Sequence, residues 1–155
     1  MEDVYRPAED SYLMVRHVKS LASGKVLDMG TGSGIQAVIA ALKPEVDYVL
    51  AVDINPAALW EAEERAGGAG GSGNLSFRRS DLFAEVKGRF DWIIFNSPYL
   101  PPGGEADEYA WAGGAGLIER FLSEARGHLE PGGSILLIYS SLSEPNLSGY
   151  DVETL

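Results

Sequence analysis

The stretch KVLDMGTGSGIQAVIAAL, residues 25–42, decides the fold class. Its first five residues form a short pattern typical of a buried strand, and glycines follow at positions 30, 32 and 34. Residues 35–42 are mostly apolar, as in a helix that packs against a sheet. A strand, a glycine turn and a helix in this order predict the first β-α unit of a parallel sheet.

The same alternation continues along the chain. We predict further helices over residues 7–21, 57–66 and 117–125, and further strands over residues 48–52, 75–79, 91–96 and 134–139. Asn55 and Pro56 suit the N-cap and the first position of the second of these helices. The predicted fold is α/β, with a mostly parallel sheet and helices on both of its faces.

The composition of the chain limits the number of domains and the kinds of partner and site. The chain has 155 residues, 45% of them apolar, which suits one domain over residues 1–155 whose N-terminal helical region is residues 1–23. Its formal net charge of -11 opposes a phosphate-rich partner, so nucleic acid is disfavoured. The absence of cysteine excludes disulfides, thiolate metal sites and a cysteine nucleophile.

Several segments predict no chemistry. The first residues lack the features of a signal peptide, and no apolar run approaches the roughly 18 residues of a membrane span, so we expect an unanchored cytoplasmic protein. His17 and His128 lack the spacing of a ligand set, so no metal site is expected. We interpret the glycine-rich residues 67–73 as a surface loop without function, and the acidic residues 104–108 as an exposed loop over the site.

Polar residues follow the predicted strands where each strand ends. Asp28, Asp53, Asp81 and Asn96 all lie at or just past such an end. Because ligands bind at the carboxyl ends of the strands in open parallel sheets, these side chains are expected to converge on one rim. Each aspartate alone has an alternative role as a helix cap.

The neighbours of the glycine turn select the ligand. Gly30, Gly32 and Gly34 suit a dinucleotide as well as S-adenosylmethionine, but Asp28 and Ile35 disfavour a pyrophosphate and favour a ligand with an ammonium group. Asp53 can accept hydrogen bonds from both ribose hydroxyls. Asp81 can accept from the adenine amine, while the Leu82 backbone N–H reaches a ring nitrogen. Together they predict an S-adenosylmethionine site.

The tetrad Asn96-Ser97-Pro98-Tyr99 indicates the methyl acceptor. A planar amide or exocyclic amino nitrogen is a poor nucleophile, because its lone pair is delocalised. The Asn96 side-chain oxygen and the Ser97 carbonyl can accept its two hydrogens, and Tyr99 can cover its flat face. The alternative is an ordinary turn, since Asn, Ser and Pro are all turn formers.

Longer motifs carry a family resemblance. SDLF at 80–83 and LEPGG at 129–133, with the glycine turn, resemble class I S-adenosylmethionine-dependent methyltransferases. VYRPAEDS at 4–11 and AWAGG at 110–114 resemble the archaeal and eukaryotic branch of the HemK-type release factor glutamine N5-methyltransferases. The resemblance implies methylation of the glutamine in the Gly-Gly-Gln loop of class I release factors. It implies that the tetrad holds the glutamine amide and that the cofactor contacts Ser11, Asp28, Gly30, Asp53, Asp81, Leu82 and Asn96.

The resemblance also implies a small zinc-binding activator subunit as a partner. The family tetrad usually has proline where Ser97 stands, and the class adds a helix and two strands after the fifth strand. Only residues 140–155 remain there, so we expect a shortened sheet or a fragment. Three alternatives stay open: N-methylation of an adenine or guanine amine in RNA or DNA, a non-catalytic S-adenosylmethionine-binding subunit, and a nicotinamide dehydrogenase.

Overall fold

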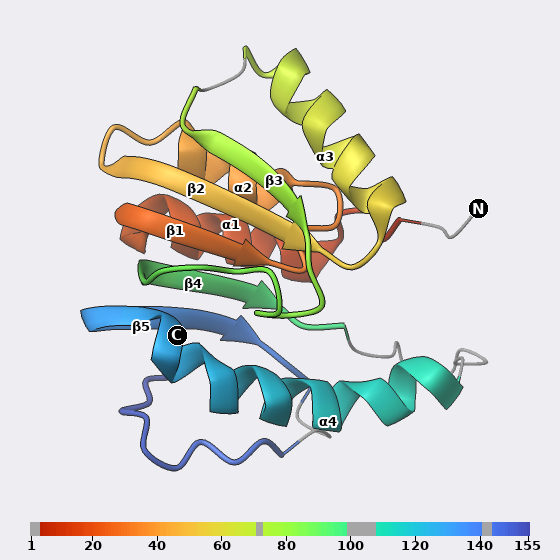
Figure 1. Ribbon diagram of the computed structural model, residues 1–155, viewed down its shortest axis with the longest axis vertical. Helices are drawn as coiled ribbons and strands as arrows, with labels where there is room; N and C mark the ends of the chain where they lie inside the picture. Colours follow the sequence, from red (N-terminus) through yellow and green to blue (C-terminus); the bar gives the residue numbers. More distant parts are fainter. Residues whose placement is uncertain (1–3, 71–72, 99–107, 141–143) are drawn as a thin grey trace.

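The computed structural model describes residues 4–70, 73–98, 108–140 and 144–155, and in them the chain forms a five-stranded sheet. The strands lie in the order β3-β2-β1-β4-β5 (Figure 1). Their bounds are β1 Gly24–Met29, β2 Val46–Asp53, β3 Leu75–Arg79, β4 Phe90–Asn96 and β5 Leu129–Ile138. Every neighbouring pair is parallel, which confirms the predicted α/β class.

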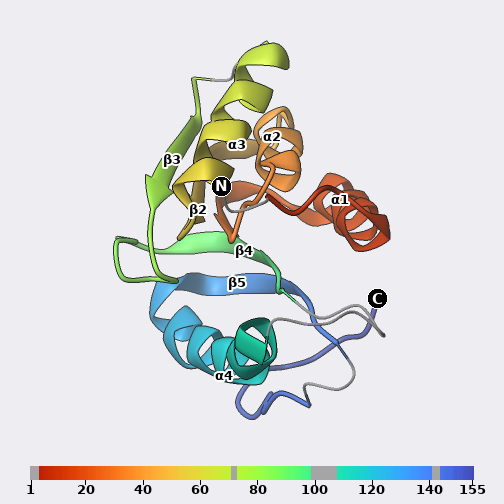
Figure 2. The same cartoon turned by 90° about the vertical axis from the view of Figure 1, so that its right-hand side faces the viewer.

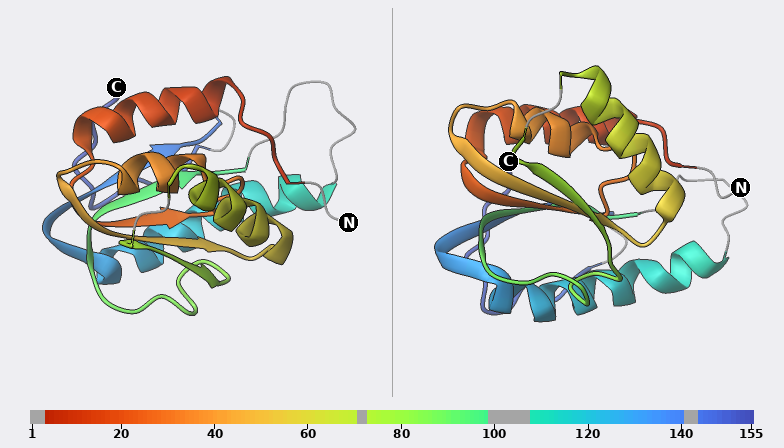
Figure 3. Two further views of the ribbon diagram at one scale, coloured as in Figure 1. Left: turned by 90° about the horizontal axis from the view of Figure 1, so that it is seen from above. Right: turned by 45° about the horizontal axis from the view of Figure 1, so that its top comes forward.

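Helices cover both faces of the sheet, as predicted. The helices α1 Glu9–Leu21, α2 Ile35–Ala41 and α3 Pro56–Gly68 lie on one face, and α4 Glu108–Ala125 lies on the other (Figures 2 and 3). A short 3-10 helix, Arg126–His128, joins α4 to β5. The crossover through α4 connects β4 to β5, which are parallel neighbours.

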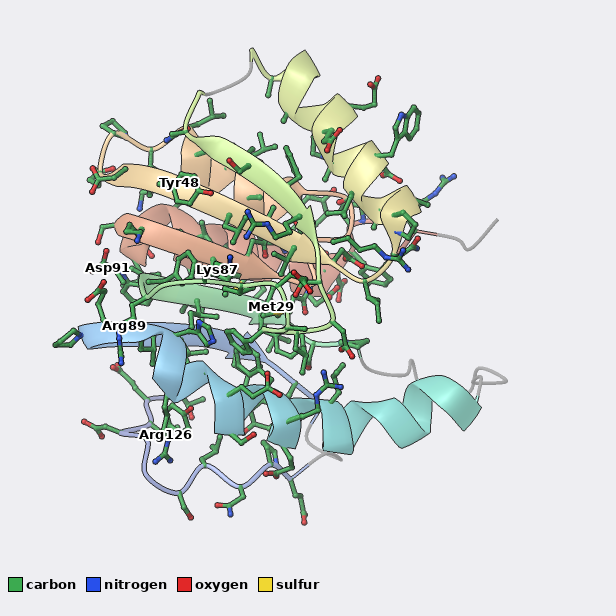
Figure 4. All side chains as sticks on the ribbon, in the orientation of Figure 1. Met29, Tyr48, Lys87, Arg89, Asp91 and Arg126 are labelled. Atoms are coloured by element: carbon green, nitrogen blue, oxygen red, sulfur yellow. The ribbon has the colours of Figure 1, made fainter. Side chains whose placement is uncertain are left out.

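Each face of the sheet has its own apolar core. On one face, Met14 and Val18 of α1 pack with the alanines of α2 against β1, β2 and β4. On the other face, Phe121 of α4 packs against Phe95 of β4, with ring centroids 4.5 Å apart. Met29 belongs to this second core and lies near the end of β1 (Figure 4). The sheet is therefore buried on both sides, which explains the nearly continuous apolar runs of its central strands.

The helix α3 begins as the sequence predicts. The Asn55 side chain accepts a hydrogen bond of 2.9 Å from the Ala57 backbone N–H, and Pro56 occupies the first helical position. This cap fixes the chain directly after β2, where Asp53 ends the strand. The N-cap thus helps to set the direction of the chain beside Asp53.

Two predicted boundaries were wrong by more than two residues. We predicted a strand from Ser134, but β5 begins at Leu129 and runs through the Pro-Gly-Gly sequence with a register shift against β4. An edge strand tolerates proline and glycine at such an irregularity, because one side of it carries no ladder. The helix predicted over residues 117–125 begins earlier, at Glu108, across several glycines whose low helix propensity hid it.

After residue 140 the described residues 144–155 contain no helix or strand. This segment contacts α4: the Tyr150 hydroxyl donates to the Leu122 carbonyl at 2.5 Å, and the Asn146 backbone N–H donates to Glu119 at 2.6 Å. Arg126, labelled in Figure 4, stacks over the Tyr150 ring at 4.6 Å. In the described parts of the chain, no helix combines the length and apolar character needed to cross a membrane.

Candidate active site

A cavity of about 390 Å³ lies at the carboxyl ends of three strands. Its walls include the last residue of β1, β2 and β4, which are Met29, Asp53 and Asn96. Three of the four polar residues predicted to converge, Asp53, Asp81 and Asn96, therefore line one cavity. The sequence-predicted residues that line it are Ser11, Gly30, Gly32, Asp53, Asp81, Leu82, Asn96, Ser97 and Pro98.

The glycine turn is held from both sides. The Thr31 backbone N–H donates to the Val52 carbonyl at 2.9 Å, and Arg65 of α3 donates to the Ser33 carbonyl at 2.7 Å. Gly34 has a φ of 79°, and a Cβ atom there would lie 2.7 Å from the Cβ of Ala62. Gly34 is therefore needed for the close approach of α3, and it does not line the cavity as the other two glycines do.

Asp28 lies behind the turn, outside the cavity lining. Only 2% of it is exposed, and its carboxylate accepts a hydrogen bond of 2.6 Å from the Thr31 hydroxyl. The pKa of Asp28 is raised to about 7: burial is the main cause and the charge of Asp53 adds to it, whereas the Thr31 hydrogen bond opposes the shift. The structure does not bring Asp28 to the surface where a ligand's ammonium group was expected, but it couples Asp28 to the turn.

Asp53 is positioned by two backbone donors. One carboxylate oxygen accepts from the Gly32 N–H and the other from the Asn55 N–H, both at 2.9 Å. A carboxylate oxygen has two acceptor sites, so each oxygen keeps one for a ligand. Ile54, the next residue, is 58% exposed and lines the same cavity. We missed Ile54, although an apolar residue directly after an acidic strand end was a usable signal.

The SDLF segment forms a tight turn at the cavity wall. Leu82 has a φ of 48°, which is rare for a residue with a side chain. The Ser80 hydroxyl donates to the Leu82 carbonyl at 2.6 Å and accepts from the Glu85 N–H at 3.0 Å. These bonds hold Leu82 in the left-handed conformation, at the position where the sequence predicts adenine recognition.

Asp81 has a partner that the sequence did not reveal. Arg120 of α4 donates to the Asp81 carboxylate at 2.8 Å, and about half of each side chain is exposed. The two residues lie on different elements and far apart in the chain, so no local pattern links them. One oxygen of Asp81 is thus engaged and the other remains to accept from a ligand.

The two polar atoms of the Asn96 side-chain amide differ, because one is hydrogen-bonded and the other is not. Its Nδ2 donates a hydrogen bond of 2.7 Å to Asp10 in the first turn of α1, and Asp10 in turn accepts from the Tyr5 hydroxyl at 2.8 Å. Its Oδ1 is buried and has no hydrogen-bond partner among the residues that the structure describes. A buried acceptor without a partner is costly, so this atom is suited to a ligand donor.

Ser97 is fixed by its own two donors. Its backbone N–H and its hydroxyl both donate to the Ile138 carbonyl at the end of β5, at 3.1 and 2.6 Å. Proline has neither donor, so the departure from the family tetrad adds a tether. Pro98 lines the cavity, whereas Tyr99 and the acidic residues 104–107 lie outside the described residues, as do the side chains of residues 108–115.

The two histidines and the paired arginines noted in the sequence lie outside the cavity lining. His128 Nδ1 lies 2.9 Å from the Gly88 carbonyl, and its ring stacks on Phe83 at 4.6 Å. The described part of the chain holds no group of three or more His, Cys, Asp or Glu side chains that could bind a metal, so His17 has no such partners there. Arg78 and Arg79, the paired basic residues, donate to the Glu85 and Ile54 carbonyls.

Known proteins share this sequence and this fold. The family described as methyltransferase small domain matches residues 7–146. A putative protein N5-glutamine methyltransferase of Methanocaldococcus jannaschii is 38% identical over 91% of this chain and 74% of its own length. Methyltransferase HEMK2 of Mus musculus is 31% identical over 92% of this chain and 74% of its own length. A release factor glutamine methyltransferase of Cereibacter sphaeroides is 39% identical over 72% of this chain, which spans only 45% of it.

A solved structure agrees with the sequence relatives. The ribosomal protein L11 methylase of Lactobacillus delbrueckii subsp. bulgaricus superposes with a TM-score of 0.68 at 25% identity, covering 86% of this chain and 61% of that one. The fold of five parallel strands thus has a methyltransferase counterpart. From the family match and the two relatives covered over most of their length, the chain belongs to the HemK-type class I methyltransferases within the methyltransferase small domain family.

Proposed function

We propose that this chain transfers a methyl group from S-adenosylmethionine to the side-chain amide nitrogen of a glutamine in the Gly-Gly-Gln loop of a class I peptide chain release factor. The observation that carries the proposal is the buried Oδ1 of Asn96, an acceptor without a described partner on a residue that lines the cavity. The glutamine methyltransferase names of the archaeal and bacterial relatives support it.

The cavity residues fit S-adenosylmethionine. We assign the free acceptor sites of Asp53 to the two ribose hydroxyls, and the second oxygen of Asp81 with the Leu82 N–H to the adenine edge. Ser11, Gly30 and Gly32 also line the cavity, and we assign them to the amino-acid end. Asp28 acts through Thr31 on the turn, and when it is ionised its negative charge favours an ammonium group nearby.

The acceptor nitrogen needs two fixed oxygens. When bound, S-adenosylmethionine supplies an electrophilic methyl group, whose transfer to nitrogen forms a C–N bond, breaks a C–S bond and releases one proton. Asn96 Oδ1 and the Ser97 carbonyl accept the two amide hydrogens, which aims the nitrogen lone pair into the cavity. The Ser97 backbone is held in place by its bonds to Ile138. The stacking role of Tyr99 stays a prediction.

Methylation of a nucleobase amine is the main alternative. The same two oxygens would suit an adenine or guanine amine, but the net charge of -11 opposes binding to a phosphate backbone. The guanidinium groups of Arg78 and Arg79 donate to backbone carbonyls, which reduces their availability for phosphates. We therefore favour a protein acceptor.

The test offers labelled S-adenosylmethionine to the protein with three acceptors in parallel. These are the cognate release factor, its variant with the loop glutamine changed to alanine, and bulk tRNA, each with and without the small zinc-binding activator subunit that the family resemblance implies. Label on the release factor alone supports the proposal. Label on tRNA supports the nucleobase alternative, and cofactor binding without any transfer supports a non-catalytic subunit.

A further inference from the structure

The amino-terminal segment supplies a contact that reaches into the tetrad. Asp10, in the first turn of α1, lies 2.7 Å from Nδ2 of Asn96, although 86 residues separate the two in the chain. Both side chains line the cavity. No other hydrogen bond among the described residues joins the side chain of a residue in α1 to the tetrad.

The chemistry of this contact fixes the orientation of the Asn96 amide. An ionised carboxylate accepts hydrogen bonds and donates none, so the amide atom that faces Asp10 must be the NH₂ group. The oxygen then has to lie on the opposite side, where Oδ1 is buried and lacks a described partner. If the amide turned over, two oxygens would face each other and the NH₂ would meet the acceptor's hydrogens.

Asp10 is itself held in place. Its second carboxylate oxygen accepts a hydrogen bond of 2.8 Å from the Tyr5 hydroxyl, and both Tyr5 and Asp10 line the cavity. The Ser11 hydroxyl accepts from the Ala8 N–H at 3.3 Å in the same first turn of α1, which fixes the start of the helix. Two hydrogen bonds thus link the half-exposed Tyr5 hydroxyl through Asp10 to the Asn96 amide, whose Oδ1 is the unbonded oxygen.

We propose that Asp10, held by Tyr5, is a positioning residue that orients the Asn96 amide so that its Oδ1 accepts a hydrogen from the methyl-accepting nitrogen. This inference rests on the proposed function for its catalytic meaning, but the contact itself does not. Asp10 acts through Asn96: it sets which end of the amide faces the acceptor.

Glu9 provides a matched control. It is the neighbouring acidic residue in the same first helical turn, it is exposed, and it does not line the cavity. Removing either carboxylate changes the net charge and the interaction with the helix dipole alike. Only removal of Asp10 should release the Asn96 amide.

The first measurement does not depend on any acceptor. In protein labelled with ¹⁵N-asparagine, the side-chain NH₂ of Asn96, assigned by its loss in Asn96→Ala, should exchange slowly with water. It should exchange at least about tenfold faster in Asp10→Ala, because that variant loses a charge-assisted hydrogen bond worth over about 1.4 kcal/mol. The exchange rate should remain unchanged in Glu9→Ala. Equal exchange in the wild type and Asp10→Ala would overturn the positioning role.

The second measurement separates transfer from cofactor binding. At saturating S-adenosylmethionine and release factor, we expect Asp10→Ala to lower the single-turnover rate about 10- to 100-fold, as a small misplacement of a reacting group does. The dissociation constant of S-adenosylmethionine should change less than about threefold, and Asp10→Asn, which still offers a carbonyl oxygen, should recover part of the rate. Rates equal to those of Glu9→Ala would overturn the inference and leave the proposed function intact. A wild-type enzyme that methylates only tRNA would refute the proposed function, while the exchange result still decides the contact.

Discussion

Arg120 of α4 and Asp81 of the SDLF turn form an ion pair of 2.8 Å at the edge of the cavity. The pair links the helix on one face of the sheet to the turn that we assign to adenine recognition. Both side chains are about half exposed, so the pair adds at most about 1 kcal/mol to the free energy of unfolding. Its larger effect is on the Asp81 carboxylate: Arg120 engages one oxygen and so fixes the orientation of the other, which remains to accept from a ligand.

The Arg120→Ala variant tests this effect. We expect the dissociation constant of S-adenosylmethionine to rise about two- to fivefold, because the Asp81 carboxylate loses its orientation, while the melting temperature stays close to that of the wild type. Titration calorimetry measures the affinity. Arg16→Ala, which removes an exposed arginine of α1, serves as the control and should leave it unchanged. Tighter binding in Arg120→Ala would show that Arg120 competes with the ligand instead.

Asp53→Ala should weaken cofactor binding strongly. The variant loses a charged acceptor of two hydroxyls and the hydrogen bond that supports Gly32. We therefore expect the dissociation constant of S-adenosylmethionine to rise at least about tenfold, or about 1.4 kcal/mol. Asp47, exposed at the other end of β2, provides the matched control through Asp47→Ala. An affinity for S-adenosylmethionine that is equal in the two variants would refute the ribose assignment.

The raised pKa of Asp28 predicts that the free energy of unfolding depends on pH. Its pKa is raised from 3.8 to about 7, so the folded state binds the proton more tightly than the unfolded state. The stabilisation from this group is fully present below pH 3.8 and is lost as pH rises through about 7. Asp28→Asn keeps an acceptor for Thr31 without the charge. Its free energy of unfolding should therefore exceed that of the wild type above neutral pH.

Urea titrations between pH 5 and 8.5 measure this difference, with Asp47→Asn as the exposed control. The gap between Asp28→Asn and the wild type should widen as pH rises toward about 7, whereas the control should follow the wild type. A gap that is constant with pH would mean that Asp28 does not titrate in this range.

Ser97→Pro should destabilise the protein although it restores the usual family residue. The substitution removes both donors to the Ile138 carbonyl, so the predicted cost is about 1–3 kcal/mol in the free energy of unfolding. Ser97→Ala keeps the backbone donor and should lose only about 1 kcal/mol. Urea denaturation distinguishes the two variants. A Ser97→Pro protein at least as stable as the wild type would show that the tether contributes nothing.

The sequence predicted the sheet and most of the rim because both depend on local patterns. Short apolar runs mark the strands, and Asp53 and Asn96 lie at strand ends that a parallel sheet must bring together. The boundaries of β5 and α4 were wrong, since the proline and glycines there lie within an irregular edge strand and a glycine-tolerant helix.

The pairings between distant residues could not be predicted. Asp10 with Asn96 and Arg120 with Asp81 join elements whose mutual approach depends on tertiary packing. The buried position of Asp28 had the same origin: the residue lies one position before the end of β1, where α2 and the turn cover it. Chemistry at strand ends predicts which residues gather, whereas packing decides which of them face the cavity.

The most direct test of the central claim is to locate the transferred methyl group. The protein is incubated with trideuteromethyl-labelled S-adenosylmethionine and the cognate release factor, with and without the activator subunit, and the product is sequenced by tandem mass spectrometry. We predict one labelled methyl group on the side-chain nitrogen of the Gly-Gly-Gln glutamine, absent with Asn96→Ala. Label on any other residue, or an equal yield from Asn96→Ala, would contradict the account.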